Sequence, residues 1–227
     1  MRRETLARQL VAVARGTALL LATVVGSGIM AERLSGGNVA LALLGNTLPT
    51  GAMLAVLILI FGATSGAHFN PAVSAVFAWR GALSWRDCAL FVMAQVAGAI
   101  VGVIAAHVMF ELPVWQVSTK PRLGFAQGVS EIVATFGLLL TIFGCLARAP
   151  AATPFAVGLY ISAAYWFTAS TSFANPAVAL ARAMTGTFTG IRPLDVPVFI
   201  AAQIFGALSA TLLFRWLVPV SPTRERS

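Results

Sequence analysis

The chain has 227 residues, of which 59% are hydrophobic and only 10% are charged. This composition excludes an ordinary soluble domain and is typical of an integral membrane protein with several spans. The formal net charge of +8 comes from basic residues scattered singly between apolar runs. Because no aromatic and basic stripe accompanies that charge, we do not expect nucleic acid as a partner.

Six apolar segments come near the roughly 20 residues that a spanning helix needs. They lie at about residues 11–31, 40–62, 86–109, 124–146, 154–170 and 196–218. Two shorter segments, at about 70–79 and 175–184, are too short to cross and are predicted as half-helices. No small-residue cleavage site follows the first apolar run, which is therefore expected to remain as a helix. We predict an all-α membrane protein with six transmembrane helices and two re-entrant half-helices.

Each half-helix begins at an Asn-Pro-Ala triplet. Proline is tolerated at the first position of a helix, and the preceding asparagine is a good N-cap. A helix that starts at mid-depth must bury its non-helical lead-in within protein or along a water-filled path, so two such starts indicate a pore. The lead-ins, residues 66–69 and 170–174, are predicted to be extended. The pore triplets are Asn70, Pro71 and Ala72, and Asn175, Pro176 and Ala177.

The two halves of the chain repeat, which favours one channel domain over residues 1–227. Repeat 1 covers about 9–110 and repeat 2 about 122–218. Because each repeat has three spans, the second must insert upside down relative to the first, giving an inverted repeat. The two positive helix ends then meet at the midplane and form a barrier to protons and other cations. The repeat-related pairs are Asn70 and Asn175 (105 residues apart), Gln95 and Gln203 (108), and Thr17 and Thr135 (118).

The basic residues predict the orientation in the membrane, since they are enriched on the cytoplasmic side. Ten of them fall on one side: Arg2, Arg3, Arg8, Arg15, Arg80, Arg86, Arg148, Arg215, Arg224 and Arg226. Five fall on the other: Arg33, Lys120, Arg122, Arg182 and Arg192. We expect a multi-pass protein of the cell inner (plasma) membrane with both termini in the cytoplasm, and we interpret most of these residues as topology signals only.

The pattern resembles the major intrinsic protein family, the aquaporins and glycerol facilitators, over nearly the whole chain. Besides the triplets, the resemblance rests on residues 65–68, Gln95 with Gly98, Gln203 with Gly206, and Glu131 ahead of Thr135. It implies an aquaporin-like fold, passive permeation of small neutral solutes across the lipid bilayer, a homotetramer and no cofactor. No phosphate-binding loop, metal cluster or nucleophile with a base is visible, so an enzyme is not expected.

The resemblance also implies a selectivity filter of Thr50, Ser172, Val178 and either Ala163 or Tyr165. Water-selective relatives carry Arg directly after the second triplet, where this chain has Val178. Without that guanidinium the constriction should be wider and less cationic. The filter resembles that of bacterial members linked to arsenous acid. We expect glycerol-like polyols, metalloid hydroxides and water as solutes; the alternatives are a plain water channel, an ion-coupled transporter and a closed-pore packing protein.

Four further residues bear on the pore. His68 has no second ligand at metal-binding spacing, so a structural role in the first lead-in is favoured over a metal or catalytic one. Glu131, by resemblance, binds backbone N–H groups of a re-entrant loop. Arg182 lies four residues after Val178 and either places its charge in the outer vestibule or snorkels to the interface. Val13 stands where the family usually has the counterpart of Glu131, which predicts a looser first loop.

Overall fold

The computed structural model describes residues 4–218, and every regular element in that range is a helix. The long helices are α1 (Leu6–Leu34), α2 (Val39–Ser65), α4 (Trp85–Met109), α5 (Phe125–Arg148), α6 (Thr153–Phe167) and α8 (Val196–Leu217). The short ones are α3 (Pro71–Trp79) and α7 (Pro176–Arg182), and two 3₁₀ turns, η1 (Pro150–Ala152) and η2 (Pro193–Asp195), precede α6 and α8. The predicted all-α fold with six main helices and two half-helices is confirmed.

Five of the long helices are long and apolar enough to cross a membrane. The sixth, α6, has only 15 residues, which corresponds to about 22 Å at 1.5 Å per residue. It is shorter than the predicted segment 154–170 because the chain leaves the helix at Thr168, whose backbone is extended. The residues that follow form the second lead-in instead of another helical turn.

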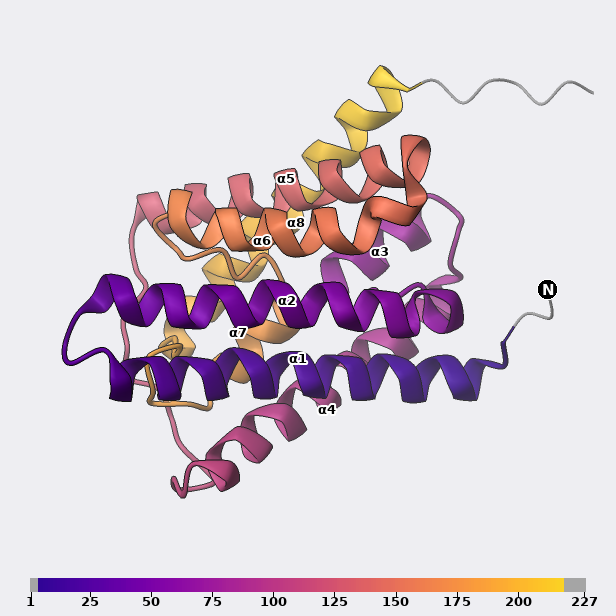
Figure 1. Cartoon of the computed structure of the whole chain (residues 1–227). Coiled ribbons are helices and arrows are strands. Elements are labelled where there is room, and N and C mark those ends of the chain that lie inside the picture. Colours follow the sequence, from indigo (N-terminus) through magenta and orange to yellow (C-terminus); the bar gives the residue numbers. More distant parts are fainter. Residues whose placement is uncertain (1–3, 219–227) are drawn as a thin grey trace, which may run out of the picture.

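The helices pair in the same way in both halves of the chain. Helix α1 packs on α4, and α5, its counterpart in the second half, packs on α8, while α2 packs on α6 across the two halves. Helix α1 runs away from the end of the bundle where the chain begins, and α5 runs back toward it (Figure 1). The start of α1 and the end of α8 lie at the same end of the bundle. This is the arrangement expected for an inverted repeat.

Glycines allow the paired helices to cross closely. A Cβ atom added to Gly98 or Gly102 of α4 would collide with the backbone carbonyl of Ala14 or Ala18 in α1. At the repeat-related crossing, a Cβ on Gly206 of α8 would collide with the carbonyl of Ile132 in α5. The small-residue face of α4 therefore lets two helix backbones approach, as small residues do in membrane bundles.

Apolar side chains face outward and many polar ones face inward. Leu159 on α6 and Leu212 on α8 are more than half exposed, whereas Gln95, Glu131 and Gln203 are fully buried. A soluble protein rarely shows contiguous exposed apolar surface on this scale, and a bilayer would cover it. Gln95 binds Ser74 on α3, and Glu131 binds Gln203 and the backbone just before α7.

Replacing Gly98 with alanine should destabilise the α1–α4 crossing by about 1–3 kcal/mol, because the added methyl group forces two backbones apart. Gly144→Ala in α5 is the matched control, since a Cβ there meets no atom within 4 Å. Alanine is the better helix former, so the control should keep or raise the melting temperature in detergent. Equal melting temperatures for the two variants would contradict this account of the crossing.

Candidate functional site

Both half-helices are capped by the asparagine of their triplet. Asn70 has φ −152° and ψ 118°, and its Oδ1 accepts a hydrogen bond from the backbone N–H of Ala72 at 2.9 Å. Asn175 has φ −158° and ψ 115°, and its Oδ1 accepts from Ala177 at 3.0 Å and from Val178 at 3.3 Å. The side-chain oxygen of each asparagine is thereby used at the helix start, and its amide nitrogen is turned away from its own helix.

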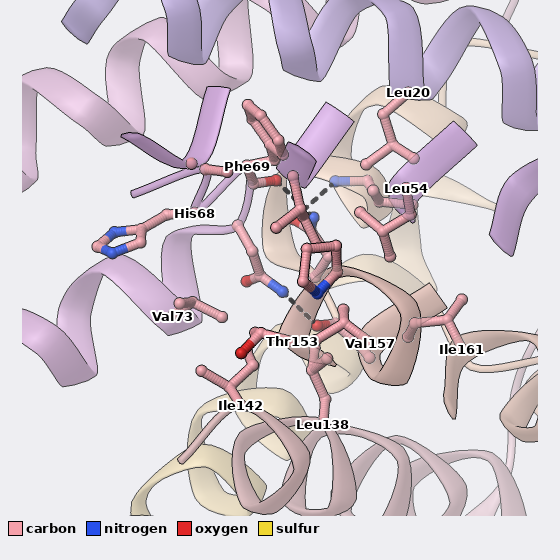
Figure 2. A pocket seen from close by; sticks show the side chains of 18 of the residues that line it. Leu20, Leu54, His68, Phe69, Val73, Leu138, Ile142, Thr153, Val157 and Ile161 are labelled. Atoms are coloured by element: carbon pink, nitrogen blue, oxygen red, sulfur yellow. Dashed lines mark hydrogen bonds between the residues drawn. The ribbon is translucent and has the colours of Figure 1, made fainter. Parts of the chain in front are cut away.

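The two asparagines lock the half-helices together. Nδ2 of Asn70 donates to the carbonyl oxygen of Ala174 at 2.7 Å, and Nδ2 of Asn175 donates to that of Phe69 at 2.8 Å (Figure 2). Each amide thus binds the carbonyl directly before the asparagine of the other repeat. An amide carries two N–H donors, so one hydrogen on each asparagine remains for a passing solute. The helix ends meet at one place inside the bundle.

A cavity of about 370 Å³ runs along these two helix ends. Apolar side chains from both repeats form most of its wall; Figure 2 shows Leu20 and Leu54 across from Leu138 and Ile142. Asn70 and Asn175 lie on its polar side. Among the residues that the structure describes, no aspartate, glutamate, lysine or arginine lines it. Such a surface suits a neutral molecule that needs a few hydrogen bonds and no counter-ion.

The backbone of the two lead-ins is not simply extended, and that expectation was wrong. Ala67 and Phe69 in the first lead-in have φ of 48° and 42°. In the second lead-in Thr171, Ser172 and Ala174 have φ of 60°, 48° and 48°. Positive φ costs an L-residue roughly 1–3 kcal/mol and persists only where surrounding contacts enforce it. Both lead-ins line the cavity, so this strain is located along the path.

Glu131 holds the second lead-in from behind. Its side chain is fully buried in α5 and does not line the cavity. Oε1 accepts from the backbone N–H of Phe173 at 2.9 Å, Oε2 accepts from that of Ala174 at 2.8 Å, and Nε2 of Gln203 donates to Oε2 at 2.6 Å. Charge-assisted hydrogen bonds of this kind are the strong ones. They fix the backbone of Phe173 and of Ala174, which has positive φ, directly after the strained residues Thr171 and Ser172.

The first lead-in has a different support. Val13, at the position equivalent to Glu131, is fully buried and offers no acceptor. Nε2 of Gln95 donates to Oγ of Ser74 at 2.9 Å, and Nδ1 of His68 lies 3.2 Å from the same oxygen. Among residues 4–218, no protein group accepts from the backbone N–H of His68 or Phe69, and the buried Oε1 of Gln95 has no partner. Contacts among the uncharged side chains of Gln95, Ser74 and His68 thus stand where the second lead-in has the carboxylate of Glu131.

Four of the predicted filter residues line the cavity. Thr50 from α2, Tyr165 from α6, and Ser172 and Val178 from the second re-entrant segment all line it and are at least 94% buried. Oγ1 of Thr50 donates to the carbonyl of Asn46, whereas Oγ of Ser172 has no protein partner. Ala163, the alternative to Tyr165, is exposed on the outer face of α6, so it does not reach the cavity.

Arg182 follows neither of its two predicted alternatives. Its side chain is 1% exposed, so it does not snorkel, and it does not line the cavity. Its Nε donates to the carbonyl of Thr189, and its Cζ lies 3.4 Å from the ring centroid of Phe173. The guanidinium is therefore held inside the protein, behind an aromatic ring that lines the cavity.

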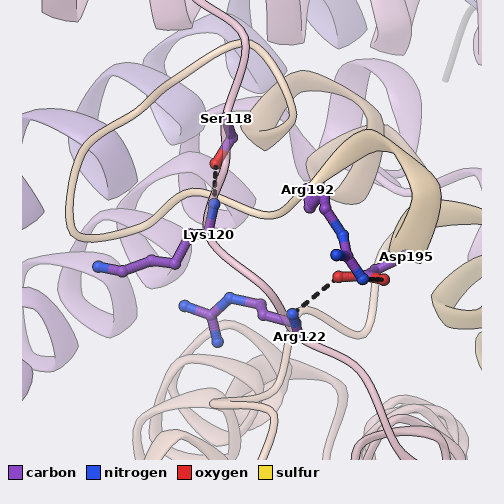
Figure 3. A network of polar contacts seen from close by, with 5 residues as sticks. All are labelled: Ser118, Lys120, Arg122, Arg192 and Asp195. Carbon is purple, nitrogen blue, oxygen red and sulfur yellow. Dashed lines mark hydrogen bonds and ion pairs between the residues drawn. The ribbon is translucent and has the colours of Figure 1, made fainter.

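A second polar cluster, which sequence reasoning missed, lies in the connections that follow α4 and α7 (Figure 3). The backbone N–H of Arg122 donates to Oδ2 of Asp195 at 2.8 Å, and Nη2 of Arg192 pairs with Oδ1 of Asp195 at 2.8 Å. Burial alone would raise the pKa of Asp195, but the hydrogen bonds from Arg192 and Arg122 outweigh it and hold the pKa below its ordinary value. No motif marks these residues, because a basic residue near an apolar helix also serves as a topology signal.

Val13→Glu should raise the melting temperature in detergent, because a carboxylate there would lie next to the unpaired N–H groups of the first lead-in. Hydrogen bonds to a charged group are worth about 1.5–3 kcal/mol each, against about 1–3 kcal/mol for fitting a larger side chain. Val13→Leu, which adds bulk without charge, is the control and should lower the melting temperature. A glutamate variant no more stable than the leucine variant would refute the idea.

Asp195→Asn should destabilise the second polar cluster, formed by Arg122, Arg192 and Asp195, in a pH-dependent way. A carboxyl group whose pKa is lowered by folding stabilises the protein above its unfolded pKa, and that contribution is lost as pH falls through the folded value. The gap in melting temperature between wild type and variant should be full at neutral pH and shrink below about pH 4. Asp87→Asn, at the start of α4, controls for the loss of a carboxylate elsewhere. A gap that does not change with pH would contradict the assignment.

Comparison with known proteins identifies the family. The model of the major intrinsic protein family matches residues 1–171. Aquaglyceroporin AqpS of Rhizobium meliloti is 58% identical over 98% of this chain and 95% of its own length, and the probable aquaporin NIP7-1 of Arabidopsis thaliana is 28% identical over 92% and 78%. The X-ray structure of the aquaglyceroporin from Plasmodium falciparum has the same fold, with TM-score 0.76 and 22% identity over 92% of this chain and 96% of that one. The chain belongs to the major intrinsic protein family.

Proposed function

We propose that this protein is a passive transmembrane channel for glycerol and other small uncharged solutes. The observation that carries the proposal is the crossed hydrogen bonding of Asn70 and Asn175 inside a cavity with no charged side chain among the described residues. Two helix N-termini, each with about half a positive charge, point to one place there. Protons and cations are disfavoured at that place, and neutral hydroxyl compounds can accept the free amide hydrogens.

Glycerol-sized solutes, and not water alone, are favoured by the filter. Val178 replaces the arginine that water-selective relatives carry, which removes volume, donors and charge from the constriction. The unpartnered hydroxyl of Ser172 offers a hydrogen bond on that wall. One relative, covered almost over its full length, is named an aquaglyceroporin, which supports the same reading. Arsenous acid, a neutral trihydroxy compound of similar shape, is proposed as a further solute of this class.

An ion-coupled transporter is disfavoured by the position of Glu131. Coupling needs a titratable or ion-coordinating group on the path, and this carboxylate is fully engaged by Phe173, Ala174 and Gln203 away from the cavity. The remaining carboxylates of the described range lie at the ends of the helices or in the connections. The cavity itself argues against a closed-pore packing protein.

We further propose a plasma-membrane location with both termini in the cytoplasm and a homotetramer with one pore per subunit. Arg80, Arg86, Arg148 and Arg215 lie at the end of the bundle where α1 begins, which the positive-inside tendency assigns to the cytoplasm. Arg2, Arg3, Arg224 and Arg226 fall outside the described residues. The tetramer rests on family membership.

Val178→Arg tests the substrate range. Liposomes that contain the purified protein are mixed rapidly with sucrose, glycerol or arsenous acid, which sets up an osmotic gradient across the membrane. Water and solute fluxes are then followed by stopped-flow light scattering. The variant should reduce glycerol and arsenous acid flux at least about tenfold and water flux much less, because a guanidinium narrows the constriction. Val178→Met, of similar length without charge, separates bulk from charge. Equal loss of all three fluxes would show that this position does not set selectivity.

A further inference from the structure

Positive charge lies near the outer end of the filter, although the filter residue Val178 is itself uncharged. Residues 110–124 connect α4 to α5, and Lys120 and Arg122 extend from this connection in the same direction (Figure 3). Nη1 of Arg122 donates to the carbonyl of Ser170 at 3.1 Å and lies 3.4 Å from Oγ1 of Thr171. Those two residues immediately precede Ser172, which lines the cavity. The guanidinium is therefore bound to the lead-in at its outer edge.

The Arg122 guanidinium is fixed in place and is not neutralised by an ion pair. Its Nε donates to the carbonyl of Gly190 at 2.8 Å, and its backbone is tied to Asp195. Among residues 4–218 the ion pairs are Arg8 with Glu4 and Arg192 with Asp195, and no protein group accepts from Nη2 of Arg122. One face of this cation is left for water or solute.

Arg122 also lies next to the aromatic wall of the pore. Its Cζ is 4.9 Å from the ring centroid of Phe173, the ring on which Arg182 is stacked. Burial lowers the pKa of Arg122, while Glu131 and the cavity-lining Tyr165 are near enough to oppose that shift. Arginine stays charged at physiological pH because its ordinary pKa is very high. Lys120 is a third cation beside Arg122 and Arg182. Burial lowers its pKa, Glu32 opposes that shift, and Arg122 and Arg182 add to it.

We infer that Arg122, carried by the α4–α5 connection, supplies at the outer mouth the positive charge that Val178 does not, and so adds a second barrier to cations outside the one that the two helix ends form at the asparagines. The filter remains wide because the charge is placed behind Ser170 and Phe173 instead of in the constriction. A cation entering from this side meets the charges of Lys120 and Arg122 before it reaches the asparagines. A neutral polyol carries no net charge and is not repelled by them.

The inference rests on the proposed channel function, so both are measured in the same vesicles. Proton leak is followed with a pH-sensitive dye and potassium leak with a potassium-sensitive dye, each under an imposed potential, and glycerol flux is followed by light scattering. Arg122→Gln should raise the leak about tenfold and leave glycerol flux within about twofold. Arg122→Lys should keep the leak low, because it keeps the charge. Arg33→Gln is the matched control, since Arg33 also binds a carbonyl and a ring, those of Phe110, on the same surface but away from the lead-in.

Two more variants make the test decisive. Val178→Arg in the Arg122→Gln background should return the leak to the wild-type level, because the charge is restored at a neighbouring position. Lys120→Glu places a negative charge beside Arg122 without removing its hydrogen bonds, and should raise the leak even where Arg122→Gln fails to assemble; Arg33→Glu controls for the same charge change.

Three results would overturn the inference: an unchanged leak in Arg122→Gln with intact glycerol flux, an unchanged leak in Lys120→Glu, or an equal leak in Arg122→Lys and Arg122→Gln. The last result would assign Arg122 to holding the backbone only. Absence of glycerol flux in the wild type would instead refute the channel function, so the two failures are distinguishable.

Discussion

The pore depends on two hydrogen bonds that cross between the repeats. Each asparagine uses its oxygen to start its own half-helix and its nitrogen to bind the carbonyl before the other asparagine. Neither half-helix is long enough to be stable alone, since isolated short helices are marginal. The N-cap and the hydrogen bond to the other repeat together provide the stability that a longer helix would gain from its own hydrogen bonds. The helix dipoles, the donors for solute and the position of both lead-ins all follow from this one contact.

In the second lead-in, the strained backbone is supported from two sides. Residues such as Ser172 and Ala174 adopt positive φ although they are not glycine, and the backbone around them is held by Glu131 on one side and Arg122 on the other. A wall that selects solutes by size must not relax around each one, because exclusion depends on differences of an ångström or less. The strained backbone, held in place by its contacts, is therefore part of what keeps the pore wall selective.

Sequence reasoning succeeded where the signal was local and failed where it was not. The apolar runs and the Asn-Pro helix starts predict every α-helix of the described range, because length and capping chemistry act within a few residues. The choice between Ala163 and Tyr165 could not be made, because two residues along a helix turn the side chain by about 200° and a small counting error reverses the face. Arg122 could not be found, because its partners on the lead-in lie 48 or more residues away. The positive φ angles were missed because Ala, Phe, Thr and Ser do not favour them.

The unequal support of the two lead-ins has a consequence for motion. The second is tied by the carboxylate of Glu131 to α5 and α8, whereas the first has two amide groups without protein acceptors among the described residues. Local opening is cheapest where fewest contacts must break. Fluctuations of the pore wall should therefore begin in the segment before Asn70. Amide hydrogen exchange there should be faster than in the segment before Asn175. One half of an otherwise symmetric channel is thus its more flexible side.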